Sequence, residues 1–339
     1  MKTKFVSGRN NLAVTIMAPF DCPNNCPFCE SKKEYAKNRP SLDGVVNAVK
    51  HIFRDNNTLD IPEVVITGGE PMANILALRK IINAIPSDKD IYINTTCIRR
   101  NFDEVVALVN SDPQIKGVNI SRHSITYEED CKTLHGIVPD EWLCKFEKSV
   151  RINCVIQERK HSFFRGVISR WEGKGVELSF REDFNTMTAE ELHNPYSHSL
   201  PYIAIEKEYL GHTQCKVCDT TTFRSVRGMV IRYHKGIKNT LISLGSDKYE
   251  INDIIVRQDG QIFADWDFTN KTLLPTILLH DYTKEIMERS RQKMVEVAST
   301  PYTTCGGWSR CIGGGCGGGY SGCGGGANYT SRFSCGGGC

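Results

Sequence analysis

Strand and helix patterns alternate six times between residue 11 and about residue 184. Short apolar runs that are typical of buried strands lie at residues 12–19, 63–67, 90–96, 117–123, 150–157 and 176–181. Apolar residues at helical spacing lie at 42–53, 74–84, 102–110, 140–148 and 163–174. This alternation predicts an α/β fold with parallel strands, right-handed crossovers and helices on the outside. Six units are too few to close an eight-stranded barrel.

Polar residues occupy every second position on the later strands. The pairs are Asn94 and Thr96, Asn119 and Ser121, Arg151 and Asn153, and Ser179 and Arg181. Alternate residues of a strand point to the same face, so the pairs predict one polar wall rather than scattered strand ends. An unpaired polar group in a dry core costs about 1–3 kcal/mol. We therefore expect the inside of the sheet to be a ligand cavity and not a packed core.

Two motifs follow the first two predicted strands. Cys22, Cys26 and Cys29 form a C-x3-C-x2-C pattern. Thiolates suit iron–sulfur clusters, and three of them leave one iron of a four-iron cluster open to an exogenous molecule. The alternative is structural zinc, which takes four ligands, usually from pairs of C-x2-C. The second motif, Gly68-Gly69-Glu70-Pro71, ends the next strand, and its glycines allow the backbone to approach a ligand closely.

Together these motifs, with Phe28 just before the third cysteine, resemble the radical S-adenosylmethionine (radical SAM) enzyme superfamily. The resemblance covers residues 11 to about 185 and implies a partial (β/α)6 TIM-like barrel. It implies that Cys22, Cys26 and Cys29 hold a 4Fe–4S cluster and that SAM binds the fourth iron. Reductive cleavage of SAM then gives a 5′-deoxyadenosyl radical that abstracts hydrogen from a substrate. By motif position, the residues expected at SAM are Phe28, Gly68, Gly69, Glu70, Asn94, Ser121 and Arg181, with Arg122 as the neighbour of Ser121 if the strand phase differs by one.

Two residues near the expected cavity are candidates for a catalytic role. Cys97 follows the third strand, and its thiol would be a hydrogen donor to a substrate radical. The alternative for Cys97 is a small buried core residue, a common environment for cysteine. His123 follows the polar face of the fourth strand and is a candidate cavity residue.

We expect three domains, with the barrel at residues 1–189, an α+β extension at 190–300 and a tail at 301–339. The extension contains two apolar runs around Asp259-Gly260, which predict a hairpin. In style it is loosely similar to the SPASM and twitch extensions that hold auxiliary clusters, but no cysteine follows its second strand. His212, Cys215 and Cys218 are candidate ligands of auxiliary zinc or an auxiliary iron–sulfur cluster, or else thiols in a turn.

The last 39 residues include 15 glycines and almost no aliphatic side chains, so they cannot bury a core. Three interpretations stay open for this tail: ligands for an auxiliary cluster, an unstructured redox or metal-acquisition segment, or a mimic of a Gly/Cys-rich peptide substrate. The cysteines of the tail are Cys305, Cys311, Cys316, Cys323, Cys335 and Cys339.

Composition limits the setting in which the chain works. A net charge of +3 gives no strong nucleic-acid signal, and no long apolar run predicts a membrane span. Fifteen cysteines, an odd count in a long chain without a recognisable signal peptide, favour metal ligation in a reducing cytoplasm. We expect an electron donor such as flavodoxin or ferredoxin and a peptide or protein substrate. The alternatives are a small molecule or nucleoside substrate, or a non-catalytic zinc or iron–sulfur protein.

Overall fold

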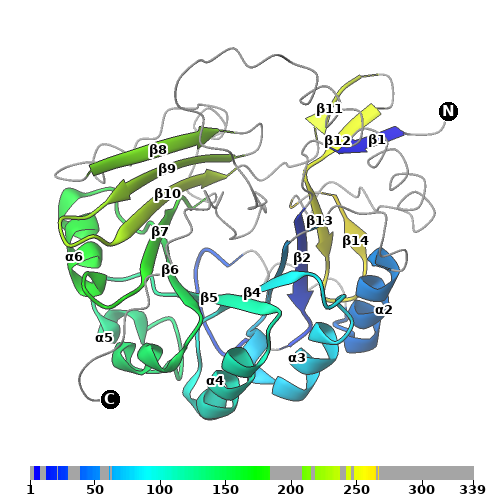
Figure 1. Cartoon of the computed structure of the whole chain (residues 1–339), viewed down its shortest axis with the longest axis horizontal. Helices are drawn as coiled ribbons and strands as arrows, with labels where there is room; N and C mark the ends of the chain where they lie inside the picture. Colours follow the sequence, from blue (N-terminus) through cyan, green and yellow to red (C-terminus); the bar gives the residue numbers. More distant parts are fainter. Residues whose placement is uncertain are drawn as a thin grey trace.

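A computed structural model describes residues 4–7, 13–20, 22–29, 39–53, 61, 63–183, 208–214, 218–236, 242–245, 248–264 and 266. Six parallel strands, hydrogen-bonded in chain order, form the centre of the molecule (Figure 1). They are β2 (Ala13–Ala18), β3 (Glu63–Gly68), β4 (Asp90–Thr95), β5 (Ile115–Ser121), β6 (Ser149–Val155) and β7 (Glu177–Arg181). The predicted α/β fold with a partial TIM-like barrel is confirmed, although β5 starts and ends two residues earlier than expected.

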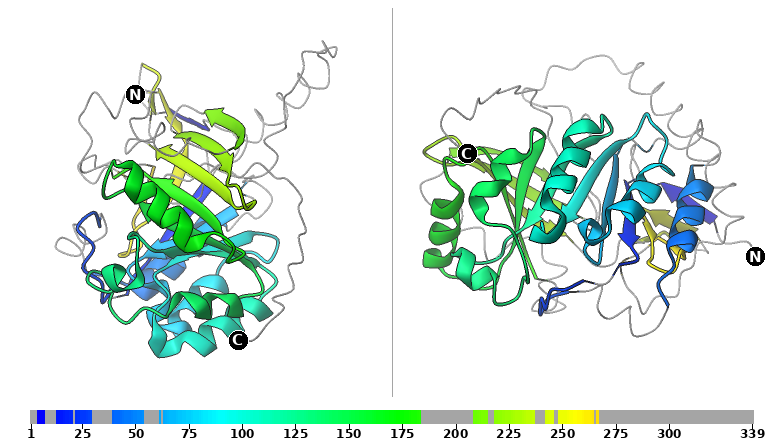
Figure 2. Two further views of the ribbon diagram at one scale, coloured as in Figure 1. Left: turned by 90° about the vertical axis from the view of Figure 1, so that its left-hand side faces the viewer. Right: turned by 90° about the horizontal axis from the view of Figure 1, so that it is seen from below.

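The connecting helices lie together on one side of this sheet (Figure 2). The longer ones are α2 (Leu42–Ile52), α3 (Ile75–Ile82), α4 (Phe102–Ser111) and α6 (His161–Trp171). The shorter ones are η1 (Pro71–Ala73), η2 (Arg99–Asn101), α5 (Tyr127–Asp130) and η3 (Asp140–Lys145). Alternate strand residues such as Ile16, Ile66, Ile93, Ile120 and Phe180 are buried with the apolar stripes of these helices in one core.

The helix expected at residues 140–148 is instead the shorter 3-10 helix η3. Its backbone bonds span three residues, from Trp142 N to Pro139 O and from Phe146 N to Leu143 O. Trp142 and Phe146 both pack on the ring of Phe102, at centroid distances of 5.5 and 5.7 Å. We infer that this shared packing favours the tighter winding, because it needs both rings on one side of a short segment.

The opposite face of the sheet is polar, as predicted. The register aligns Asn94, Asn119, Arg151 and Glu177 across β4 to β7. A second row aligns Ser121, Asn153 and Ser179. None of these side chains belongs to the helix-covered core, so the inner face has a different chemistry from the outer one.

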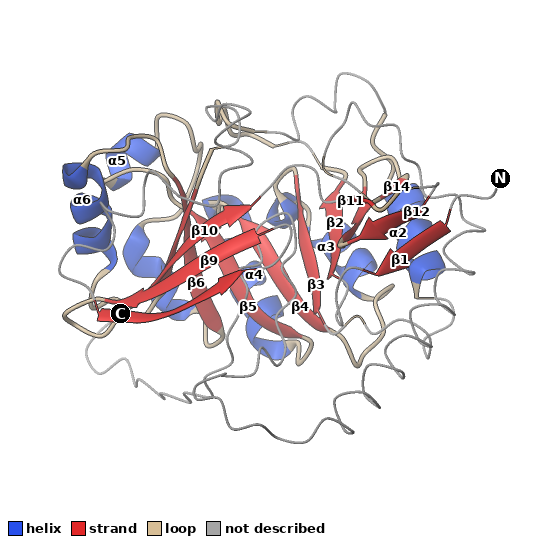
Figure 3. Ribbon diagram, turned by 90° about the horizontal axis from the view of Figure 1, so that it is seen from above, coloured by secondary structure: helices blue, strands red, loops and turns tan. Residues whose placement is uncertain are grey.

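The region expected to form the extension continues this sheet at both edges (Figure 3). At one edge β10 (Val230–Gly236) pairs in parallel with β7 and is followed by the antiparallel strands β9 (Cys218–Arg224) and β8 (Glu208–Gln214). At the other edge β13 (Asp253–Val256) pairs in parallel with β2, and β14 (Ile262–Phe263) completes the predicted hairpin. A small separate sheet contains β1 (Lys4–Ser7), β12 (Lys248–Ile251) and β11 (Ile242–Ser243).

The turn of this hairpin packs on the start of α2. Gly260 has a φ of +86°, and a Cβ at this position would lie 2.4 Å from the backbone of Gly44. Ser41 N donates to Gln258 O at 2.8 Å, while the Ser41 hydroxyl caps α2 by accepting from Gly44 N. The hairpin thus fixes the first helix at the edge of the barrel. Among the described helices, none has the length and apolar character needed to cross a membrane.

Candidate functional site

The candidate site lies where the central strands end at their carboxyl termini, the edge at which parallel α/β sheets bind ligands. Residues 22–29, here called the Cys loop, follow β2 and carry Cys22, Cys26 and Cys29, which are partly exposed and not disulfide-bonded. Within the described part of the chain, no three His, Cys, Asp or Glu side chains converge as metal ligands. The loop therefore supplies the soft donor set of a cluster, but its thiols are not drawn together around one point.

Gly68 and Gly69 bring the end of β3 against the end of β2. Gly68 has a φ of +111°, which side chains disfavour. A Cβ on Gly68 would lie 2.5 Å from Ala18 N, and Gly69 N donates to Ala18 O at 3.4 Å. Glycine is therefore required at Gly68 by local geometry, and the predicted role of the pair in holding SAM is additional to it.

Glu70, the third residue of this motif, is almost fully buried, with 1% of its surface exposed. One oxygen accepts from Met72 N at 3.1 Å and from the Thr95 hydroxyl. The other accepts from Thr96 N at 2.8 Å and from the Thr96 hydroxyl at 2.6 Å. A carboxylate has about four lone-pair sites, and four donors already occupy them. In this arrangement Glu70 joins the end of β3 to the end of β4.

Asn24 connects this pair of strand ends to the Cys loop. Its side-chain amide donates to Cys22 Sγ at 3.3 Å and to Thr96 Oγ1 at 3.0 Å. Its carbonyl oxygen accepts from His135 N at 2.8 Å. Burial raises the pKa of the Cys22 thiol, and hydrogen bonds from the backbone and side chain of Asn24 partly oppose the shift. The sequence offered a polar residue between two cysteines but no indication of its distant partners.

His123 supports the other side of the Cys loop. Its ring lies 4.6 Å from that of Phe28 in an edge-to-face contact, and its Nδ1 accepts from Val155 N at 3.1 Å. Burial, reinforced by the charges of Arg122 and Arg170, lowers the pKa of His123 to about 3. His123 is therefore a neutral imidazole whose Nδ1 is an acceptor. It contacts Phe28, and both remain predicted site residues.

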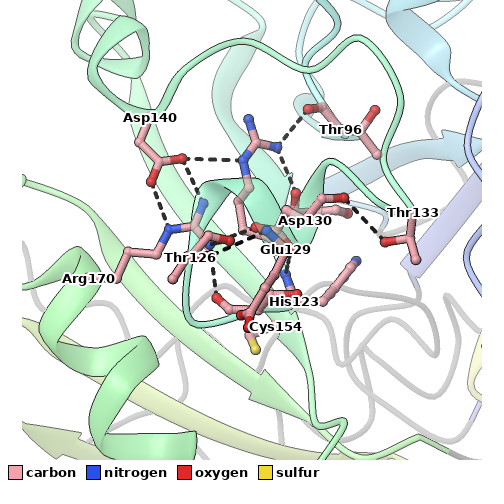
Figure 4. A network of polar contacts seen from close by, with 12 residues as sticks. Thr96, His123, Thr126, Glu129, Asp130, Thr133, Asp140, Cys154 and Arg170 are labelled. Atoms are coloured by element: carbon pink, nitrogen blue, oxygen red, sulfur yellow. Dashed lines mark hydrogen bonds and ion pairs between the residues drawn. The ribbon is translucent and has the colours of Figure 1, made fainter.

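A buried ionic network lies behind His123 (Figure 4). Asp130 accepts from His123 N at 2.8 Å and from Arg170 Nη1 at 2.7 Å. Arg170 also donates two bonds to Asp140, at 2.8 and 2.9 Å. Burial raises the pKa of Asp130 despite the neighbouring Arg170. No local sequence pattern indicates this network, because Arg170 is 40 residues from Asp130 and 30 from Asp140.

Arg122 belongs to the same network and not to the cavity wall. Its guanidinium donates to Thr96 O, Ser121 O and Val138 O at 2.8 to 3.0 Å, and its Nε lies 3.5 Å from Asp140. With its side chain fully buried, it braces the ends of β4 and β5. This leaves Ser121, and not Arg122, as the inward residue at the end of β5.

The predicted SAM residues on the strands share the inner face. Asn94 accepts from Asn119 Nδ2 at 2.8 Å, while its own amide nitrogen has no partner among the described residues. The same holds for Asn153 Oδ1 and Ser179 Oγ in the part of the chain that the structure describes. Arg181 is buried at the end of β7, in register with His234 of β10. Several buried polar atoms on one wall suit a polar ligand, so the inner face fits a molecule such as SAM.

Farther from the Cys loop, the inner face carries an ionic cluster. Glu177 accepts from Arg151 Nε at 3.1 Å and from Arg232 of β10 at 3.3 Å. Burial alone would raise the pKa of Glu177, but the two arginines outweigh it and lower the pKa. Two arginines thus share one carboxylate at this part of the wall.

Cys97, a candidate for a catalytic role, is 1% exposed and belongs to the apolar core cluster. It follows β4 with a φ of +58°, so the alternation of the strand does not extend to its side chain. Burial raises the pKa of its thiol to about 12. This environment is that of the alternative interpretation, a small buried core residue, and a role as hydrogen donor stays a prediction.

The candidate auxiliary ligands lie outside the described side chains. His212 and Cys218 are on β8 and β9, whose backbones are described, but their side chains are not. The other candidates, Cys215, Cys305, Cys311, Cys316, Cys323, Cys335 and Cys339, lie outside the described residues altogether. An auxiliary zinc or iron–sulfur site therefore stays a prediction.

Comparisons with known proteins agree with the motifs and the fold. Residues 13–114 match the family described as a 4Fe-4S single cluster domain. No curated protein sequence matches the chain. This family match covers β2 to α4 and therefore includes the Cys loop and the Gly68–Pro71 motif.

Solved structures extend the likeness beyond this segment. SuiB from Streptococcus suis, bound to S-adenosylmethionine, is 14% identical with a TM-score of 0.51, over 80% of this chain and 64% of SuiB. The chain thus spans less than two thirds of SuiB. anSMEcpe with bound AdoMet and a Kp18Cys peptide is 12% identical with a TM-score of 0.51, over 86% of each chain. HemN from Escherichia coli, described as a radical SAM enzyme, is 11% identical over 60% of this chain and 51% of HemN, with a TM-score of 0.38. The chain therefore matches a 4Fe-4S single cluster domain over residues 13–114 and shares its fold with SuiB and anSMEcpe.

Proposed function

We propose that this protein is a radical SAM enzyme that modifies a peptide or protein substrate. The observation that carries the proposal is the meeting of three elements at one end of the barrel. The Cys loop, the Gly68–Glu70 segment and the end of β4 are joined through Asn24, Thr96 and Glu70. A structural metal site would need the cysteines alone.

Cys22, Cys26 and Cys29 would hold a 4Fe–4S cluster, and the inner face beside it would hold SAM. When bound, this pair supplies one-electron cleavage of SAM to methionine and a 5′-deoxyadenosyl radical that abstracts a substrate hydrogen. The chain's own residues then have simpler tasks. Gly68 and Gly69 allow the backbone to approach SAM, and Asn94, Ser121 and Arg181 offer polar groups on the wall. Neutral His123 keeps Phe28 and the Cys loop in place.

A peptide substrate is supported by anSMEcpe, whose structures contain AdoMet together with Cys-containing peptides. A flavodoxin or ferredoxin would supply electrons. An oxygen-sensitive cluster would require a reducing compartment such as the cytoplasm.

The test is formation of 5′-deoxyadenosine by anaerobically reconstituted protein given SAM and dithionite. We expect the product with the native chain and none with Cys26→Ala. Bound zinc in place of iron in the native chain would refute the proposal. For the substrate class, Cys-containing peptides are added and analysed by mass spectrometry. A modified peptide mass, formed only with SAM, would support peptide modification, whereas product formation stimulated only by small molecules would favour the alternative.

A further inference from the structure

One side chain in the Cys loop is buried among the described residues 22–29. Asn24 is 3% exposed, whereas the three cysteines are partly exposed and Asn25 is exposed. Burial of a primary amide is unfavourable unless its hydrogen-bonding groups find partners. The hydrogen-bond partners of Asn24 therefore indicate why this side chain is buried.

Each group of the Asn24 amide has a partner. Its two N–H groups are donated to Cys22 Sγ and to Thr96 Oγ1, and its oxygen accepts from His135 N. The hydrogen bonds are compatible with one another, because the Thr96 hydroxyl donates its proton to Glu70 and can therefore accept from Asn24. A cluster ligand is thus two hydrogen bonds away from the side chain of Thr96 and three from Glu70.

The neighbouring backbone of the Cys loop makes a second contact with the segment that contains His135. Asn25 N donates to Thr133 O at 2.7 Å, in the same segment that supplies His135. Two consecutive residues of the Cys loop are therefore bound to residues 133–135. Asn24 carries the connection onward to Thr96, beside the end of β4, and through Thr96 to Glu70.

A hydrogen bond to a ligand sulfur stabilises the reduced cluster more than the oxidised one, because reduction adds negative charge to the sulfurs. We propose that Asn24 is a positioning residue of the cluster, and that its amide raises the reduction potential through Cys22 while Thr96 keeps the Cys loop in register with the SAM segment. The inference rests on the proposed function, since it assumes that Cys22 ligates a 4Fe–4S cluster.

The test is a redox titration of the reconstituted full-length protein, followed by electron paramagnetic resonance. The variants are Asn24→Ala, which removes both donors, and Asn24→Asp, which keeps the size and the acceptor for His135 N. The controls are Asn25→Ala and Asn25→Asp, which make the same chemical changes at the exposed neighbour. We expect both Asn24 variants to lower the equilibrium constant for reduction about tenfold or more, which is about 59 mV for one electron. The Asn25 variants should lie close to the native protein.

Each outcome decides the inference. Equal potentials in Asn24 and Asn25 variants, with native iron content, would overturn it. Should the Asn24 variants lose iron, their thermal unfolding is compared with that of metal-free native protein. Unchanged unfolding with selective iron loss would support positioning of the cluster, whereas a much lower Tm would show Asn24 to be only a structural residue and overturn the inference. Failure of the native chain itself to take up iron would refute the proposed function instead, which keeps the two failures distinct.

Discussion

The Glu70→Gln variant distinguishes two roles for Glu70: a carboxylate that stabilises the fold and a direct ligand of SAM. The native carboxylate accepts four hydrogen bonds, two on each oxygen, from Met72, Thr95 and Thr96. Glutamine has one acceptor oxygen, so its NH2 group must face the backbone N–H of either Met72 or Thr96. A buried donor left unsatisfied costs about 1–3 kcal/mol, and the remaining bonds lose their charge assistance. The expected total is about 2–5 kcal/mol.

The assay is thermal unfolding of cluster-loaded protein without SAM, followed by circular dichroism. Since 1 kcal/mol shifts Tm by about 2–4 °C in a large domain, we expect Tm to fall by at least about 4 °C. Glu128→Gln makes the same change at an exposed position of α5 and should leave Tm nearly unchanged. An unchanged Tm for Glu70→Gln, together with lost SAM binding, would refute the reasoning and identify Glu70 as a direct ligand.

Three further predictions concern the surrounding residues. Arg170→Ala leaves Asp130 and Asp140 without their shared partner and should lower the free energy of unfolding in urea by about 3–5 kcal/mol. Arg165→Ala, at an exposed position of the same helix, should lower it far less. Equal losses in the two variants would contradict the network. In native metal-free protein, iodoacetamide should label the partly exposed cysteines of the Cys loop but not Cys97. Rapid labelling of Cys97, detected by peptide mapping, would show that its thiol is accessible and would favour a position in the cavity. In the folded protein the pKa of His123 is about 3, below its ordinary value of 6.5, so the unfolded chain binds a proton more readily. The contribution of His123 to the free energy of unfolding is therefore complete above pH 6.5 and falls by about 1.4 kcal/mol per pH unit as the pH drops towards 3. His123→Asn keeps an acceptor near Nδ1, and its free energy of unfolding should depend less steeply on pH between 6 and 4. A slope equal to that of the native protein would count against a neutral buried His123.

The parallel strands could be predicted from the sequence because short apolar runs alternate with helical patterns along the chain. The polar wall at Asn119, Asn153 and Ser179 followed from polar residues at alternate positions of the strands. The hairpin at Asp259-Gly260 was equally visible, since Gly260 needs a positive φ. These features are local, and their physical causes lie within a few residues.

Features that depend on distant partners could not be predicted. The pairing of β13 with β2 joins residues about 240 apart, and no local pattern specifies which strand edge is free. Asn24 and Thr96 are 72 residues apart, so neither reveals the other. Cys97 follows β4 with a positive φ, so the alternation of the strand does not predict where its side chain lies.

The central claim is that the Cys loop holds a cluster with one iron open to SAM. The most direct measurement is the electron paramagnetic resonance spectrum of the reduced, reconstituted protein before and after SAM is added. We predict a 4Fe–4S signal whose g values change when SAM is added. The signal should be lost in three variants: Cys22→Ala, Cys26→Ala and Cys29→Ala. It should be retained in Cys131→Ala, which changes a partly exposed cysteine outside the Cys loop. A cluster signal that SAM leaves unchanged, or one that survives loss of any of the three cysteines, would contradict the claim.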